Sequence, residues 1–153
     1  MRRVPVDAGP ARPDARRPPI PTNAEIARIS CECFNDRDFE RSLEYLDDEI
    51  AWTEVPNGRV FRGKHAIVEE YQSWARAFPD GRLEIRNIIE AGDWVICEFV
   101  VTGTMTGPLH GVDGTEIPPT GKLTRVALCD VMHFRNGKVF EGRSYFVELP
   151  PGT

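Results

Sequence analysis

The sequence predicts an α+β fold in which a curved antiparallel sheet wraps around a long helix and two shorter N-terminal helices. Helical periodicity is confined to the first half of the chain, whereas long apolar strands dominate the second half. The pair Asn136-Gly137 stands between two apolar runs and indicates a tight hairpin, because a type I′ turn needs positive φ at both central residues. A strongly twisted sheet curls around its helices, so we expect a cone-shaped pocket between the two layers.

The composition fits a single folded domain preceded by an irregular tail. Residues 1–21 contain six of the thirteen prolines and five arginines, with few large apolar side chains, and this predicts a disordered tail before a domain at residues 22–149. The tail has a net charge of +3 in a chain whose total is -5, which leaves -8 for the remainder. This acidic remainder argues against nucleic acid as a partner.

The cysteines and the hydropathy pattern indicate a cytoplasmic protein without a membrane segment. Four cysteines lack C-x-x-C spacing, and free, reduced thiols are expected for Cys31, Cys33, Cys97 and Cys129. No apolar run reaches 18 residues, and no apolar segment follows the two arginines near the N-terminus. His65 and Glu69 have the spacing of a helical metal pair but lack further ligands, so we expect neither a metal nor another cofactor.

The first part of the chain predicts two helices and a short hairpin. Thr22-x-x-Glu25 is a capping box, and apolar residues follow it at helical spacing up to a break at residues 35–38. A second, short helix is marked by Phe39, Leu43 and Leu46. A strand from Ile50 to Val55 then ends at Pro56-Asn57-Gly58, and Val60 and Phe61 suggest a brief return strand.

A third helix and four long strands complete the prediction. From Lys64 to Phe78 one wide apolar stripe is formed by Ile67, Tyr71, Trp74, Ala75 and Phe78. Alternation between Leu83 and Glu90 predicts a strand with Leu83, Ile85, Asn87 and Ile89 on one face. Further strands are expected at residues 94–106, before the Asn136-Gly137 turn, and at residues 139–146.

Several short motifs, in this order, resemble those of the SnoaL-like polyketide cyclases. They are Gly63-x-x-Ala66-Ile67, Phe78-Pro79-Asp80, Gly103-Thr104-Met105-Thr106-Gly107, Pro119-Thr120-Gly121-Lys122 and Gly137-Lys138-Val139. The resemblance covers residues 22–148 and implies a cystatin-like α+β fold with cofactor-free acid/base chemistry on a small polyketide-like substrate. Family members usually have histidine where this chain has Met105, and aspartate on the last strand where this chain has Val147.

A second resemblance is to the ketosteroid isomerases. Their hydrogen-bonding acid lies in a segment similar to residues 129–134, where Asp130 occupies its position. The position of their catalytic base is occupied here by Val55, so that the nearest carboxylate is Glu54.

The residues themselves give two candidate acid/base groups. Asp130 lies within an apolar strand, where burial would raise its pKa and leave a neutral acid that can donate a hydrogen bond; the alternative is a surface or ion-paired residue. Glu54 lies two residues after Trp52, so both side chains share one strand face, and Glu54 is either a general base against the indole or a carboxylate facing water.

The two histidines are further catalytic candidates. His133 differs from Asp130 by an odd number of residues, which predicts the outer face unless a bulge redirects it. His110 follows Gly107 in a loop, where it either serves as a proton shuttle at the pocket mouth or is simply solvated. The expected substrate-binding residues are Trp52, Tyr71, Trp74, Met105, Met132, Ser144 and Tyr145.

Three functions are compatible with these patterns. The first is a cofactor-independent cyclase or isomerase for a small polyketide-like or terpenoid substrate in natural-product biosynthesis, with Asp130 as acid and Glu54 as base. The second is an epoxide hydrolase or epoxide-opening cyclase of the same fold, and the third is a non-catalytic small-molecule-binding module. An apolar outer sheet face, with Val101, Ala127 and Val131 expected on it, predicts a homodimer.

Overall fold

The computed structural model describes residues 19–152, so most of the predicted tail lies outside the described residues. Three helices and a 3₁₀ turn occupy the first half of the chain: α1 (Asn23–Asp36), α2 (Phe39–Ser42), η1 (Leu43–Tyr45) and α3 (Lys64–Ala77). Two strands lie between η1 and α3, namely β1 (Leu46–Glu54) and β2 (Arg59–Arg62). The strands after α3 are β3 (Arg82–Ala91), β4 (Trp94–Thr104), β5 (Leu109–His110), β6 (Glu116–Ile117), β7 (Leu123–Arg135) and β8 (Lys138–Glu148).

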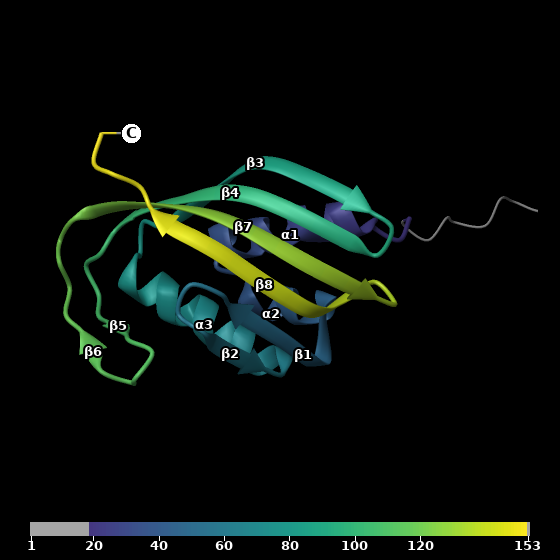
Figure 1. Cartoon of the computed structure of the whole chain (residues 1–153), viewed down its shortest axis with the longest axis horizontal. Helices are drawn as coiled ribbons and strands as arrows, with labels where there is room; N and C mark the ends of the chain where they lie inside the picture. The colour runs from purple at the N-terminus through teal and green to yellow at the C-terminus, as the bar shows by residue number, and fades with distance from the viewer. Residues whose placement is uncertain (1–18, 153) are drawn as a thin grey trace, which may run out of the picture.

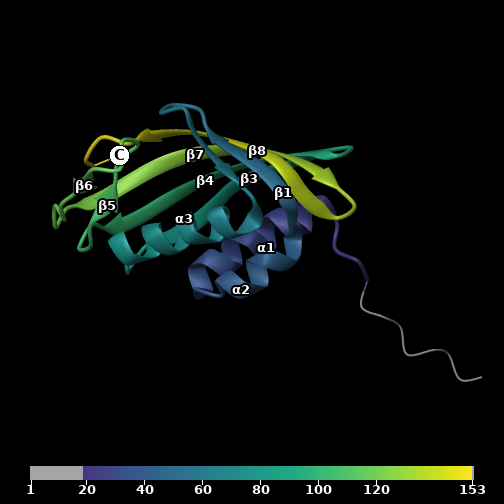
Figure 2. The same ribbon diagram turned by 90° about the horizontal axis from the view of Figure 1, so that it is seen from below.

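Six strands form one curved sheet in the order β2-β1-β8-β7-β4-β3, as Figure 1 shows. The helices α1, α2 and α3 all lie against the same face of this sheet (Figure 2). The predicted α+β class, with helices on one side of a curved sheet, is therefore confirmed. We call the face toward the helices the inner face and the opposite one the outer face.

The prediction of a fully antiparallel sheet was wrong for one strand pair. β8 runs parallel to β1, with Trp52 opposite Gly142 and Glu54 opposite Ser144. Turn residues report only on pairs of strands that follow each other directly in sequence, whereas β1 and β8 are separated by the whole middle of the chain. This parallel pair is important for the site because it joins the first strand to the last.

Local turn and cap chemistry was predicted correctly from the sequence. Asn136 and Gly137 have φ values of 52° and 70°, as a type I′ turn requires, and they connect β7 to β8. At the start of α1 the Thr22 hydroxyl accepts from the Glu25 amide at 3.2 Å, and the Glu25 carboxylate accepts from the Thr22 amide at 2.7 Å. These contacts satisfy two amide groups that have no partner within the helix.

Three local features differ from the predictions. Leu46 begins β1 rather than ending the second helix, because only residues 39–45 keep helical or 3₁₀ geometry. A bulge between Ile85 and Asn87 reverses the alternation of β3, so that Ile88 packs on the core while Ile89 is 49% exposed. The loop after β4 contains the small β5–β6 hairpin, which strand alternation had not indicated.

The core lies between the inner face and the helices. The side chains of β4 that lie on the inner face are Val95, Cys97, Phe99 and Val101. The prediction that Val101 lies on the outer face was therefore wrong, because residues two apart on a strand share a face. All four cysteines are free thiols, as expected. None of the helices within residues 19–152 is long and apolar enough to cross a bilayer.

Candidate active site

A cavity of about 160 Å³ lies between the inner sheet face and the helices α1 and α3. Its wall is mostly apolar and aromatic, with side chains from both helices and from all six strands of the sheet. Three carboxyl residues, Glu54, Glu70 and Asp130, reach it, and its described lining contains no Lys, Arg or His. The cavity is therefore an apolar space with acidic groups at selected points of its wall.

Three of the polar lining residues lie in one row across neighbouring strands. Glu54 on β1 is opposite Ser144 on β8, and Ser144 is opposite Asp130 on β7. Adjacent strands are about 4.8 Å apart, so the backbones of Glu54 and Asp130 are separated by roughly 10 Å. The parallel β1–β8 pair thus brings both carboxyls to one wall of the cavity, with Ser144 between them.

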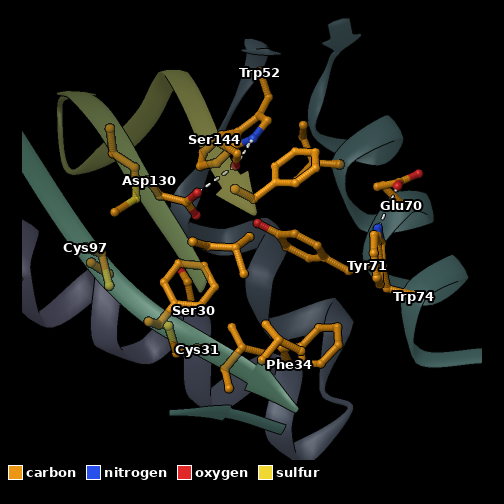
Figure 3. Close-up of a pocket in the computed structure, with 18 of the residues that line it drawn as sticks. Ser30, Cys31, Phe34, Trp52, Glu70, Tyr71, Trp74, Cys97, Asp130 and Ser144 are labelled. Atoms are coloured by element: carbon orange, nitrogen blue, oxygen red, sulfur yellow. Dashed lines mark hydrogen bonds between the residues drawn. The ribbon is translucent and has the colours of Figure 1, made fainter. Parts of the chain in front are cut away.

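Asp130 is held by a chain of two hydrogen bonds (Figure 3). The Trp52 indole Nε1 donates to Ser144 Oγ at 3.0 Å, and the Ser144 hydroxyl donates to Asp130 Oδ1 at 2.6 Å. Burial raises the pKa of Asp130 to about 7, with the Ser144 hydrogen bond lowering it and the negative charge of Glu54 raising it. Asp130 is thus a carboxyl that is substantially protonated near neutral pH.

Glu54 is the second carboxyl of the row, and it is buried. Burial raises its pKa, while a hydrogen bond from Asn57 Nδ2 at 2.7 Å and the charge of Arg59, whose guanidinium is 3.8 Å away, lower it. Trp52 and Glu54 both line the cavity, as their spacing predicted. Among residues 19–152 no group of three or more His, Cys, Asp or Glu side chains is arranged to hold a metal ion.

Glu70 on α3 lines the cavity but was not predicted from the sequence. Its carboxylate makes a bidentate ion pair with Arg59 of β2 at 3.2 and 3.3 Å and accepts from the Trp74 indole at 2.9 Å. Its positions relative to Ile67 (i+3) and Trp74 (i-4) place it on the apolar stripe of α3, and that spacing was the available signal. Arg59 thus connects two of the three carboxyls.

Other predicted binding residues also reach the cavity. Tyr71, Trp74, Met132 and Ser144 line it together with Trp52. Figure 3 shows the Tyr71 hydroxyl pointing from α3 into the space in front of Ser144. Burial raises the pKa of Tyr71, which keeps the phenol neutral and able to donate. Within the described residues this hydroxyl has no hydrogen-bond partner.

Four predicted site residues do not line the cavity. His133 lies on the outer face, stacked on Trp94 with ring centroids 3.9 Å apart, in agreement with its parity relative to Asp130. His110 is exposed in β5, and Met105 is buried against Ala77 and Phe78 beyond the cavity. Tyr145 is 45% exposed on the outer face, because it alternates with Ser144 and Phe146.

Position 147 is also outside the cavity. Phe146 lines the cavity, whereas Val147 is 60% exposed and lies over a shallow depression of the outer face. A carboxylate in place of Val147 would consequently not face the ligand space in this chain. The last strand therefore contributes Ser144, and no carboxylate, to the cavity wall.

The profile of the SnoaL-like polyketide cyclase family matches residues 24–150. The chain belongs to this family. The sequence has no significant match among functionally curated proteins. The SnoaL-like fold accounts for the curved sheet and for the cavity enclosed by α1 and α3.

Solved structures of SnoaL-like and related proteins have the same fold. A candidate SnoaL-like polyketide cyclase from Jannaschia sp. CCS1 is 20% identical, with a TM-score of 0.67 over 87% of this chain and 91% of that one. AclR, a candidate hydroxylase from Streptomyces galilaeus, is 22% identical, with a TM-score of 0.67 over 82% and 74%. IdmH, a candidate polyketide cyclase from Streptomyces antibioticus, is 20% identical, with a TM-score of 0.65 over 81% and 91%.

Proposed function

We propose that this SnoaL-like protein is a cyclase or isomerase that uses its own side chains for acid/base catalysis on a small, apolar carbonyl compound in natural-product biosynthesis. The observation that carries the proposal is Asp130, a half-buried carboxyl with a pKa near 7 in the wall of an apolar cavity. Such a group donates a hydrogen bond to an oxygen on which negative charge develops. Membership of the SnoaL-like family supports the same class of reaction.

The mechanism uses three polar groups of the cavity wall. Protonated Asp130 and the neutral Tyr71 hydroxyl donate to the substrate carbonyl oxygen. Glu54, across the row, removes a proton from the adjacent carbon, so that the C–H electron pair forms an enolate held by the two donors. The proton on Glu54 then returns to a different carbon in an isomerisation, or to the alkoxide oxygen that forms when the enolate carbon attacks a second carbonyl.

The cavity also limits the substrate. A dry cavity of 150 Å³ accommodates benzene, so about 160 Å³ has room for roughly one or two fused rings. Three carboxyl residues and no basic residue in the described lining disfavour a carboxylate or phosphate on the ligand, because like charges repel in a low-dielectric site. We therefore infer an uncharged, mono- or bicyclic carbonyl compound of polyketide-like or terpenoid type.

A proton-exchange assay tests this proposal. The probe is 2-tetralone, an uncharged bicyclic ketone whose α-protons exchange with D₂O and are followed by ¹H NMR. We expect the wild-type protein to accelerate the exchange, and Glu54→Gln to lose the acceleration because the base is removed. Binding of 2-tetralone without accelerated exchange would contradict the enzymatic proposal and favour a small-molecule-binding module.

Epoxide opening is the second candidate reaction. The specific observation in its favour is again the neutral acid: protonated Asp130 can give its proton to an epoxide oxygen as the C–O bond breaks, while Glu54 takes the proton of the water or internal hydroxyl that attacks the ring carbon. The end of β8 contributes no carboxylate to the cavity, because residue 147 is a valine on the outer face. Hydrolysis of styrene oxide without exchange of 2-tetralone would select this second reaction.

The protein is further proposed to act in the cytoplasm, as a homodimer formed through the outer sheet face. The four free thiols support the compartment. Supporting the dimer, strand register places Ile96, Val131 and Arg143 in one row of the outer face, beside a second row of Glu98, Cys129 and Tyr145. Apolar groups and both signs of charge on one surface suit a self-complementary interface.

Light scattering coupled to size-exclusion chromatography tests the dimer. We expect a mass of twice 17.3 kDa at micromolar concentration, and a monomer for Ile96→Lys, which places a charge in the centre of the interface. Val60→Lys, at an exposed site on β2, is the matched control and should leave the mass unchanged. A monomeric wild-type protein would contradict the proposal.

A further inference from the structure

We propose that Trp52, Ser144 and Gly142 form a positioning device that fixes which oxygen of Asp130 faces the ligand, an inference that rests on Asp130 being the acid of the proposed function. None of the three is itself assigned a proton-transfer step. The device combines residues of β1 and β8 and depends on the parallel pairing of these two strands.

The chemistry of the donors sets the direction of the hydrogen bonds. An indole Nε1–H can only donate, so Ser144 Oγ accepts from Trp52. Within the described residues the single Ser144 proton has no acceptor other than Asp130 Oδ1, 2.6 Å away. Oδ1 is therefore occupied as an acceptor. The acidic proton of neutral Asp130 belongs on Oδ2, which makes no hydrogen bond with residues 19–152 and remains available to a ligand.

Gly142 provides the space in which the indole lies. Trp52 on β1 is directly opposite Gly142 on β8, and a Cβ at position 142 would overlap the six-membered ring of the indole. That overlap involves a buried ring rather than the end of a flexible chain, so an alanine at position 142 has to displace Trp52. The missing side chain thus allows the indole N–H to reach Ser144, two residues further along the same strand.

The groups around Asp130 determine how the device acts on its charge. Glu54 faces it from β1, Tyr71 from α3, Cys31 from α1 and Cys97 from β4. None of these groups is a cation, and the Ser144 hydrogen bond is the one contribution that favours the ionised form. A short bond from a hydroxyl to a carboxylate is stronger than one to a neutral acid. The device therefore opposes the effect of burial and keeps Asp130 able to titrate near neutral pH.

The test is a carboxyl ¹³C NMR titration of the full chain with labelled aspartate, with Asp130 assigned by the loss of its signal in Asp130→Asn. Ser144→Ala should raise the titration midpoint by roughly one pH unit, because the hydrogen bond to the ionised form is lost. Trp52→Phe and Gly142→Ala should each produce a smaller rise, since both leave the Ser144 hydroxyl free to turn. Ser144→Thr, unlike Ser144→Ala, keeps a hydroxyl at this position, so Asp130 should titrate with the wild-type midpoint in this variant.

Trp74→Phe is the matched control. It also removes an indole donor from the cavity wall, but that donor serves Glu70, so the Asp130 midpoint should not change. An unchanged midpoint in Ser144→Ala, or an equal rise in Trp74→Phe and Trp52→Phe, would overturn the proposal. If Gly142→Ala does not fold, the Trp52→Phe and Ser144→Ala results decide it.

The titration separates this proposal from the proposed function. Shifted midpoints in a protein that does not exchange 2-tetralone would support the positioning device and reject Asp130 as a catalytic acid for that ketone. Exchange activity with midpoints that do not respond to Ser144→Ala would reject the device and leave the acid/base proposal in place.

Discussion

Two carboxyl clusters face each other across the cavity, and each is held by a tryptophan indole, yet only one includes a cation. On the sheet side, Trp52 donates to Ser144, which donates to Asp130. On the helix side, Trp74 donates to Glu70, whose charge is paired with Arg59. Figure 3 shows Trp52, Ser144 and Asp130 on the sheet side of the pocket, and Glu70 with Trp74 on α3.

This difference gives two carboxyls on the wall of one cavity different partners. Glu70 accepts two parallel hydrogen bonds from the Arg59 guanidinium. Asp130 receives only a hydroxyl and remains next to the negative charge of Glu54, so burial dominates and raises its pKa to about 7. The absence of a cation from the described surroundings of Asp130 is what leaves it a usable acid.

Removal of the acid should have the largest effect. Asp130→Asn keeps the shape and the acceptor for Ser144 but loses the titrating proton, so turnover should fall roughly 10²-fold to 10⁴-fold with folding intact. The 2-tetralone exchange rate measures this fall. A variant as active as the wild type would show that the cluster without a cation, formed by Trp52, Ser144 and Asp130, is not the catalytic one.

The same substitution should change how stability depends on pH. The pKa of Asp130 is raised from 3.8 to about 7, so wild-type stability is lost as the pH rises between these values, whereas the Asp130→Asn variant incurs no such loss. We expect the variant to gain at most about 4 kcal/mol relative to the wild type between pH 4 and pH 8. Urea unfolding at the two pH values measures the difference, and equal pH dependences would contradict it.

Loss of the cation should weaken the second cluster. Arg59→Met removes the partner of Glu70 and a charge near Glu54, and we expect a destabilisation of about 1–3 kcal/mol because a partly buried carboxylate is left unpaired. The pKa of Glu54 should rise further, since one of the groups that lowers it is gone. Thermal unfolding measures the stability, with Arg62→Met on exposed β2 as control.

The smallest effect is expected on the outer face. His133 lies three residues after Asp130 on β7 but stacks on Trp94, with Phe140 against its ring, outside the cavity. His133→Ala should therefore change the exchange rate less than roughly 2-fold, because the group cannot reach the ligand. A dead His133→Ala protein beside an active Asp130→Asn protein would reverse the assignment of the two faces.

Sequence patterns were sufficient wherever neighbours in space are near in sequence. Alternation placed Trp52 and Glu54 on one face and separated Asp130 from His133, and the Asn136-Gly137 turn fixed the last hairpin. These features follow from the two-residue period of a strand and from local φ requirements. An acid within an apolar strand was visible for the same reason.

The parts that escaped prediction depend on long-range pairing. The Trp52–Ser144 hydrogen bond joins residues 92 positions apart, and it exists because β8 inserts beside β1 in parallel. The ion pair of Arg59 with Glu70 depends on how β2 packs against α3. The bulge in β3 exchanged Ile88 and Ile89 because one extra residue reverses all later alternation.

The most direct test of the central claim is the titration of Asp130 in the wild-type protein. Carboxyl ¹³C NMR of the aspartate-labelled chain, with Asp130→Asn to assign the signal, gives its midpoint without a substrate. Because no cation lies among the described neighbours of Asp130, we expect its midpoint at a pH of about 7. A midpoint near 3.8, the ordinary value, would mean that Asp130 is ionised at neutral pH and cannot serve as the hydrogen-bonding acid of this cavity.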